Sequence, residues 1–542
     1  MMLKSAVLLA TAVLIAVAQP QDRATIRVDL GTSLGKIKPV WAFFGHDEPN
    51  YTYMKDGLKL NTELQAMSPV SVYVRVHNLL TSGDGKAALK WGSTNAYTED
   101  AQGRPVYDWT IVDRIFDTWL QRGMKPLVEI GFMPEALTTG PQPYRHTWDP
   151  SVKGSSIYTG WAYPPKDYAK WGALVEAWVK HCVQKYGKAE VESWWWEVWN
   201  EPDISYWKAT PEEYFRLYDV AARAARKALP TLRMGGPTTT GPGNEKAAKF
   251  LRDFLTFVEK NNTPLDFISF HAKGRPTFPE GHVRMGPEKQ MQDVSRGFEI
   301  VTSFPTFKKL PIIIGESDPE GCAACGARWN PQNAYRNGTM YSSYTAATFA
   351  RKHDLAAKHG VNFEGAVTWA FEFEDQPWFE GYRDLATNGV DKPVLNVFRM
   401  FGMMGLERVE VDSDRAGDGD DINGFATRST RGAEVMVWNY HNDDVPGPDA
   451  TISVPVKGLP AGTTQVLVRH YRVDRTHSNS YTPWLAMGSP QQPTPDQIAT
   501  LTKAGQLQLS DSPQWLPVKN GAIALDFVLP RQGVSLLQLS WP

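Results

Sequence analysis

Two short segments of the sequence carry glutamates near their C-terminal ends that could act together on one bond. WWWEVWNEPD, residues 194–203, carries Glu197 and Glu201, and LPIIIGES, residues 310–317, carries Glu316. Side chains alternate along a strand, so Glu197 and Glu201 share a face, with Glu201 at the strand end before a proline and Glu197 about 13 Å further down. Paired carboxylates across a cleft suit cleavage of a glycosidic bond, where one protonates the leaving oxygen and the other attacks or supports the anomeric carbon.

Strand-like and helix-like segments alternate through most of the chain. Eight short apolar, β-branched runs are typical of strands: residues 40–45, 71–78, 125–132, 193–201, 231–236, 266–272, 310–317 and 363–373. Segments with apolar residues at helical spacing include residues 108–123, 166–187, 212–229, 245–260 and 343–360. Eight such units predict an α/β fold, a closed (β/α)8 TIM barrel over residues 40–405. No G-x-G-x-x-G follows the first strand, which disfavours a dinucleotide-binding sheet.

The pattern changes after about residue 405. Short strands of alternating polarity, separated by turns, replace the strand–helix units there. We therefore predict a C-terminal β-sandwich domain over residues 406–542. A strand-like stretch at residues 24–39 precedes the first barrel strand and is expected to join that sandwich.

The first residues have the composition of a secretion signal. Lys4 precedes an apolar run, residues 6–17, that ends at an A-x-A site, residues 16–18. The run is about 12 residues long, whereas about 20 are needed to span a bilayer. We expect residues 1–18 to be a signal peptide and the mature chain to be secreted or periplasmic, without a membrane anchor.

The charge balance argues against nucleic acid and anionic membranes as partners. The 57 Lys and Arg residues nearly balance the 59 Asp and Glu residues, and no basic run occurs, so nothing favours nucleic acid or an anionic membrane as a partner.

The chain has three cysteines. Cys182 falls in a helical segment and is expected to be a buried small hydrophobe. Cys322 and Cys325, in GCAACG, either close a small disulfide loop or remain free thiols. Two thiols without neighbouring ligands fall short of a tetrahedral set, so no metal or other cofactor is expected.

Polar residues at the predicted strand ends form the candidate site. In an eight-stranded barrel, active-site residues lie at the C-terminal ends of the strands. The residues found there are Arg75, His77, Glu129, Asn200, Glu201, His271, Glu316, Trp369 and Glu372. Glu201 and Glu316 belong to the fourth and seventh strands, on opposite sides of the ring. Glu197 lies lower and is expected to be a buried carboxylate that supports the site.

The two glutamate segments also resemble a known family. WNEPD (199–203) and IIIGESD (312–318) look like the acid/base and nucleophile strands of clan A glycoside hydrolases, specifically family 39, which contains β-xylosidases and α-L-iduronidases. YVRVHN (73–78) and the segment 116–137 resemble the xylosidase members. FISFHAKG (267–274) and ESDPEG (316–321) resemble the iduronidase branch as well, and HYRVDRTHSN is similar to the β-domain of both. GCAACG departs from the iduronidase pattern, which leaves the role of that loop in substrate choice open.

The resemblance implies roles for individual residues. Glu201 would be the general acid/base and Glu316 the nucleophile of a retaining mechanism, with Arg75 holding Glu316 ionised. Asn200 would hydrogen-bond the sugar 2-hydroxyl, a contact that strengthens in the transition state. The remaining substrate-binding candidates are His271, Trp369, His77, Lys273, Glu372 and Glu374. His77 has a buried core histidine as its alternative, and Glu374 a solvated loop acid.

The resemblance leads to an expected function with two alternatives. The expectation is a secreted exo-acting retaining glycosidase that removes β-D-xylosyl units from xylo-oligosaccharides. An iduronidase-like uronide hydrolase, or another pentoside hydrolase, is the nearest alternative, because Lys273 in HAKG matches a lysine that binds the substrate carboxylate in iduronidases. Acids after the last two strands, such as Asp318 and Glu320, could instead pair with Lys273. A non-catalytic carbohydrate-binding protein would need neither glutamate. The oligomeric state, including a homo-oligomer, stays open.

Overall fold

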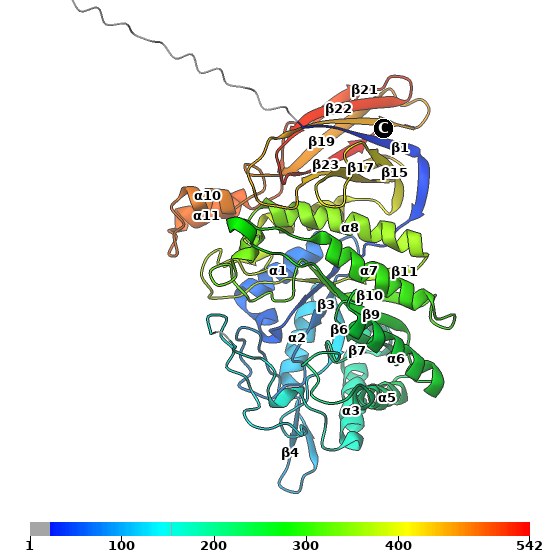
Figure 1. Ribbon diagram of the computed structural model, residues 1–542, viewed down its shortest axis with the longest axis vertical. Coiled ribbons are helices and arrows are strands. Elements are labelled where there is room, and N and C mark those ends of the chain that lie inside the picture. The colour runs from blue at the N-terminus through cyan, green and yellow to red at the C-terminus, as the bar shows by residue number, and fades with distance from the viewer. Residues whose placement is uncertain (1–21, 153) are drawn as a thin grey trace, which may run out of the picture.

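The structure is a computed structural model that describes residues 22–152 and 154–542, so the predicted signal peptide lies outside the described residues. Figure 1 shows a barrel surrounded by helices and, stacked against one side of it, a separate β-sheet domain, with α8 (Thr339–His359) running between the two. Within the described ranges, no helix is both long and apolar enough to cross a lipid bilayer.

Parallel strands form the closed ring of the barrel. In chain order they are β2 (Phe43–His46), β3 (Tyr73–Val76), β6 (Lys125–Ile130), β7 (Trp195–Val198), β8 (Arg233–Thr239), β9 (Phe267–Lys273), β10 (Pro311–Asp318), β11 (Asn362–Ala366) and β12 (Thr368–Trp369). β11 pairs with β10, and β12 pairs with β2. The two pieces, separated by one residue, therefore act as the eighth strand and close the ring, which confirms the predicted barrel.

The barrel strands are buried on both faces, which explains their continuous apolar runs. Ile312, Ile313 and Ile314 of β10 are all fully buried, because one face of a barrel strand packs in the interior and the other under helices. The helices of this part are α1 (Lys55–Ala66), α2 (Thr110–Leu120), α3 (Tyr168–Tyr186), α4 (Lys188–Val191), α5 (Pro211–Ala228), α6 (Glu245–Asn261), α7 (Pro287–Thr302), α8 and α9 (Pro393–Met403). Two small hairpins, β4–β5 (Tyr97–Glu99, Pro105–Tyr107) and β13–β14 (Ala386–Thr387, Val390–Asp391), lie in the connecting segments.

The second part is a mixed ten-stranded sheet. Its strands are β1 (Asp22–Lys36), β15 (Glu407–Ser413), β16 (Asp421–Arg428), β17 (Gly432–Tyr440), β18 (Ala450–Lys457), β19 (Gln465–Val473), β20 (Gln508–Leu509), β21 (Gln514–Pro517), β22 (Ala522–Leu529) and β23 (Val534–Ser540). β1 lies between β15 and β18. β18 and β19 lie near opposite ends of the sheet but share one buried core, so the sheet folds over on itself.

Two helices in the C-terminal part were not predicted from the sequence. α10 (Tyr481–Ala486) and α11 (Pro495–Ala504) interrupt the strands between β19 and β20, and they project to one side in Figure 1. Trp484 of α10 and Leu501 of α11 pack on Trp378 and Phe379, which belong to the loop after the eighth barrel strand. The C-terminal part thereby supports a loop on the C-terminal side of the barrel.

Candidate active site

Glu201 stands in a turn just beyond its strand. β7 ends at Val198, and Trp199 and Glu201 have positive φ angles of 74° and 40°. The Glu201 N–H donates to the Thr238 carbonyl at 2.9 Å, which fixes the turn. The prediction of one strand through residue 201 is therefore wrong, because the left-handed backbone ends the two-residue alternation. The turn, rather than strand geometry, aims the Glu201 side chain.

Glu197 lies beneath the site, as the sequence suggested. Its side chain is fully buried, whereas that of Glu201 is 14% exposed. Glu197 forms an ion pair with Arg75 and accepts a hydrogen bond from Ser269 Oγ at 2.9 Å. It therefore holds neighbouring side chains in place from below.

Glu316 lies across the ring from Glu201, and His271 stands between them. His271 Nδ1 is 2.8 Å from Glu201 Oε1 and 3.8 Å from Glu316 Oε1. One oxygen of Glu201, one of Glu316 and a nitrogen of His271 all lie within 4.8 Å of one another. Two carboxylates at this separation can approach one bond from opposite sides, one as a proton donor and the other as a nucleophile.

Arg75 on β3 connects four residues of the site. Its guanidinium contacts Glu197, Glu129 at 2.8 Å and Glu316 at 3.4 Å, and donates to Asn200 Oδ1 at 3.0 Å. Burial by itself would lower the pKa of Arg75, but the surrounding carboxylates outweigh burial and raise it. Arg75 therefore supplies a permanent positive charge at the floor of the site.

His77 and Trp369 form the wall next to Glu316. His77 Nδ1 is 2.7 Å from Glu129 Oε2, and its Nε2 is 3.5 Å from Glu316 Oε1. Burial opposes protonation of His77, but Glu129 and the other nearby carboxylates outweigh it and raise the pKa to about 9, so the ring is charged at neutral pH. The Trp369 ring lies 4.3 Å from the His77 ring, centroid to centroid, and 5.1 Å from the Arg75 guanidinium.

Lys273, at the end of β9, contacts Glu316 directly. Its Nζ forms an ion pair with Glu316 Oε2 and a second one, at 3.0 Å, with Asp318 Oδ2. Burial of the Glu316 carboxyl opposes ionisation, but the positive charges of Lys273 and His77 outweigh burial and hold its pKa well below the usual range. Glu316 is therefore ionised, and the ammonium of Lys273 is already paired within the chain.

Some buried polar atoms in the site make no hydrogen bond among the described residues. Asn200 accepts from Arg75, but its Nδ2 donor is buried and makes no hydrogen bond there. His271 Nε2 is also buried without a hydrogen bond in that part of the chain. Such atoms cost free energy unless a ligand satisfies them. The Asn200 amide thus offers a donor for a substrate hydroxyl.

Glu372 and Glu374 belong to a different environment. Glu372 accepts from the Gly389 N–H at 2.5 Å, and Glu374 accepts from the Asp56 N–H at 3.2 Å. These hydrogen bonds join Glu372 to loop backbone and Glu374 to the first turn of α1, and no hydrogen bond or ion pair in the described residues joins either side chain to Glu201 or Glu316. The structure therefore brings together eight of the ten predicted site residues and leaves these two with the loop after the eighth strand.

Sequence reasoning missed Asp47, which follows the first barrel strand. Asp47 Oδ1 accepts from Trp369 Nε1 at 3.2 Å and lies 3.3 Å from His77 Nε2, and Oδ2 pairs with Lys90 at 2.6 Å. The rule that selected the other strand ends applies equally to FFGHD, so this segment carried a usable signal. Lys90 lies in a long connection without a strand or helix pattern that could have placed it.

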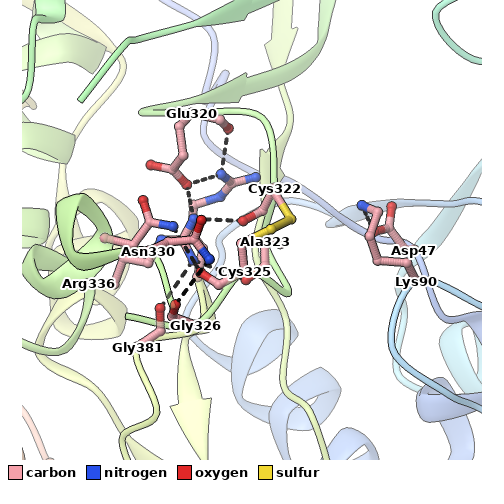
Figure 2. The surroundings of a disulfide bond; sticks show 12 residues. Asp47, Lys90, Glu320, Cys322, Ala323, Cys325, Gly326, Asn330, Arg336 and Gly381 are labelled. Atoms are coloured by element: carbon pink, nitrogen blue, oxygen red, sulfur yellow. Dashed lines mark hydrogen bonds and ion pairs between the residues drawn. A yellow bond between two sulfur atoms is a disulfide. The ribbon is translucent and has the colours of Figure 1, made fainter. Parts of the chain in front are cut away.

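Cys322 and Cys325 form a disulfide with an S–S distance of 2.01 Å, whereas Cys182 is a buried free thiol. Figure 2 shows that the buried Arg336 points into the disulfide turn, with the Asp47–Lys90 pair on the other side of the sulfurs. Arg336 donates to the carbonyls of Cys322 at 2.7 Å and Cys325 at 2.9 Å. The turn after β10 is thus held by one guanidinium as well as by the disulfide.

The positive charges around Glu316 disfavour a metal ion in the site. Glu201, His271 and Glu316 offer three ligand atoms close together. However, Lys273 occupies one oxygen of Glu316, and Arg75 contacts the other at 3.4 Å. A divalent cation would be repelled by these charges. The arrangement suits an anionic nucleophile better than a metal ligand set.

Known proteins resemble this chain over most of its length. The family model named Glycosyl hydrolases family 39 matches residues 24–514. A β-xylosidase of Caldicellulosiruptor saccharolyticus is 29% identical over 524 residues, covering 94% of this chain and 97% of that protein. A β-xylosidase of Geobacillus stearothermophilus is 27% identical over 483 residues, 86% of each chain. A crystal structure of a monomeric β-xylosidase from Caulobacter crescentus CB15 has a TM-score of 0.75 at 24% identity and covers 95% of this chain and 99% of its own, so the two share a fold.

Proposed function

We propose a specific reaction for this chain, which belongs to glycosyl hydrolase family 39 and is a β-xylosidase-like glycoside hydrolase. The reaction is the release of terminal β-D-xylosyl residues from xylo-oligosaccharides with retention of anomeric configuration. Glu316 acts as the nucleophile and Glu201 as the general acid/base. The predicted signal peptide supports a secreted or periplasmic location.

The separation of the two carboxylates carries this proposal. Their nearest oxygens lie within 4.8 Å. Retaining glycosidases hold the two carboxyl groups about 5–5.5 Å apart, whereas inverting ones need about 6.5–9.5 Å to admit a water molecule. The shorter distance supports direct attack by one carboxylate.

The surroundings of each acid support its role. Glu316 is kept ionised by Lys273 and His77, as a nucleophile must be. Glu201 lies nearer the solvent and within 2.8 Å of His271 Nδ1, where it can deliver a proton to the leaving oxygen and later take one from water. Asn200 Nδ2 is the donor available to the sugar 2-hydroxyl.

The pairing of Lys273 favours a neutral sugar over a uronide. A free ammonium at this position would attract a substrate carboxylate. Here Glu316 and Asp318 both neutralise it, and a uronate would have to compete with Glu316 itself for this cation. We therefore expect p-nitrophenyl β-D-xyloside to be cleaved far faster than an α-L-iduronide. Faster cleavage of the iduronide would reverse the choice of substrate while leaving the catalytic pair unchanged.

Alanine variants of the two acids test the assignment. Glu316→Ala should abolish turnover of all substrates, because no covalent intermediate can form. Glu201→Ala should keep first-step turnover of substrates with good leaving groups, and added azide should accelerate its slow second step and give a β-xylosyl azide of retained configuration. A retained azide product from Glu316→Ala instead would exchange the two roles.

A further inference from the structure

A row of largely buried charges of alternating sign runs from Glu316 to the disulfide turn. Lys273 lies between Glu316 and Asp318, and Arg383 Nη2 lies 3.4 Å from the same Asp318 oxygen that Lys273 contacts. Arg383 also pairs with Glu320, which pairs in turn with Arg336 under the disulfide turn. Asp318 therefore lies between two cations, Lys273 and Arg383, and of these two only Lys273 contacts Glu316.

Asp318 is firmly held. Its side chain is fully buried, with 0% solvent exposure. Its Oδ1 accepts a hydrogen bond from the Trp369 N–H at 2.9 Å. Lys273 and Arg383 share Oδ2. Since Glu320 supplies Arg383 with an anion of its own, Asp318 remains available as the second partner of Lys273.

Formation of the covalent intermediate removes the charge of Glu316. A lone pair of the Glu316 carboxylate forms the bond to the anomeric carbon, and the bond from that carbon to the leaving oxygen breaks. The leaving oxygen keeps the bonding electrons and takes the proton of Glu201, so the negative charge moves from Glu316 to Glu201. Lys273 then faces a neutral ester on the Glu316 side, and a largely buried ammonium is unfavourable unless another anion contacts it.

We propose that Asp318 is a positioning residue that takes over the ammonium of Lys273 when Glu316 becomes esterified. The proposal rests on the proposed function, because it takes Glu316 as the nucleophile. Before attack, Lys273 is shared between Glu316 and Asp318. After attack, Asp318 alone neutralises it. Hydrolysis of the ester restores the Glu316 carboxylate and the shared arrangement.

Asp318 therefore lowers the barrier of the first chemical step more than that of the second. Without the charge of Asp318, attack by Glu316 leaves the Lys273 ammonium with no anionic partner. Hydrolysis of the intermediate restores the Glu316 carboxylate and with it a partner for Lys273. Asp318→Asn should lower kcat/KM for aryl β-D-xylosides, which reports the first step, about 100-fold, equivalent to about 2.7 kcal/mol at 1.36 kcal/mol per tenfold. It should lower kcat for 2,4-dinitrophenyl β-D-xyloside, which reports the second step while a pre-steady-state burst is present, less than about 5-fold, and the rate of that burst should fall.

Asp384→Asn is a matched control. Asp384 forms a buried ion pair with Lys392, and no contact in the described residues joins that pair to Glu316. Both variants lose one buried carboxylate charge opposite a lysine and should lower Tm alike, but Asp384→Asn should leave the ratio of the two steps unchanged. Equal effects of Asp318→Asn on kcat/KM and on the dinitrophenyl kcat would overturn the proposal.

A double-mutant cycle separates this mechanism from simple disruption of the site. In a Lys273→Met background no ammonium can be stranded, so adding Asp318→Asn should cost less than about 5-fold in kcat/KM. A further loss of about 100-fold there would contradict the proposal. Mass spectrometry of a trapped covalent intermediate separates the proposed function from the role of Asp318. Labelling of a residue other than Glu316 refutes the proposed function. Labelling of Glu316, together with equal effects of Asp318→Asn on the first and second chemical steps, refutes only the role of Asp318.

Discussion

Replacing Arg75 by methionine tests whether one guanidinium holds the floor of the site together. Arg75 contacts three carboxylates, but two of them have other cationic partners: Glu129 has His77, and Glu316 has Lys273. Among the described residues, Glu197 would keep only the side-chain hydrogen bond from Ser269. One carboxylate is therefore orphaned, so the expected loss in unfolding free energy at pH 7.5 is about 3–5 kcal/mol, the usual cost of removing one partner of a buried ion pair.

The pH dependence of this loss distinguishes an orphaned charge from lost packing. In the variant, Glu197 is buried without a cation, so its pKa in the folded state should rise above its unfolded value. A raised carboxyl pKa gives stability at low pH that disappears as the pH increases. The difference in unfolding free energy between wild type and Arg75→Met should therefore shrink between pH 7.5 and pH 5.5.

Urea unfolding, followed by tryptophan fluorescence at both pH values, measures this difference. Arg233→Met is a suitable control, because Arg233 donates to the Trp194 carbonyl, stacks on Trp195 and forms no ion pair with a carboxylate within residues 22–152 and 154–542. Its loss should be the same at both pH values. An Arg75→Met variant within about 1 kcal/mol of wild type, or a loss independent of pH, would refute the reasoning.

Three further perturbations have defined outcomes. The pKa of His77 is about 9 in the folded protein and about 6.5 in the unfolded chain, so protonation of His77 stabilises the fold fully below about pH 6.5 and this stabilisation is lost as the pH rises towards 9. Urea unfolding at a series of pH values should show a loss of about 3 kcal/mol from this group in wild type and no such loss in His77→Phe. Replacing Cys322 and Cys325 by serine should lower the unfolding free energy by about 2 kcal/mol, as expected for a loop of this size, and equal stability of oxidised wild type and variant would argue against the disulfide. Gly45→Ala places a Cβ 2.4 Å from the Trp369 ring and should cost about 1–3 kcal/mol, so an unchanged Tm would contradict the tight packing of that wall.

Hydrophobic periodicity was sufficient to predict the barrel, because its strands are short and buried on both faces. It failed where the backbone leaves regular geometry. The strand predicted through residue 201 ends at Val198, since positive φ angles at Trp199 and Glu201 follow from contacts to other strands. α10 and α11 were missed because each is short and lies among strands, and because their positions depend on packing against the barrel loop.

The candidate site shows the same division. Strand-end positions placed Arg75, His77, Asn200 and His271 beside the two glutamates, because the barrel brings all strand ends to one face. Loop residues could not be placed in this way. Glu372 accepts from a loop amide and Glu374 from an amide in the first turn of α1, and Lys90 comes from a long connection. Asp318 was among the predicted partners of Lys273, but the direct pairing of Lys273 with Glu316 depends on the register of β9 and β10.

Trapping the covalent intermediate tests the catalytic assignment most directly. A 2-deoxy-2-fluoro-β-D-xyloside with a dinitrophenyl leaving group forms the glycosyl-enzyme and slows its hydrolysis, because fluorine destabilises the oxocarbenium-like transition state. Peptide mapping by mass spectrometry should find the fluoroxylosyl group on Glu316. Labelling of Glu201, or complete hydrolysis of the reagent to an α-configured sugar without any labelled peptide, would contradict the assignment.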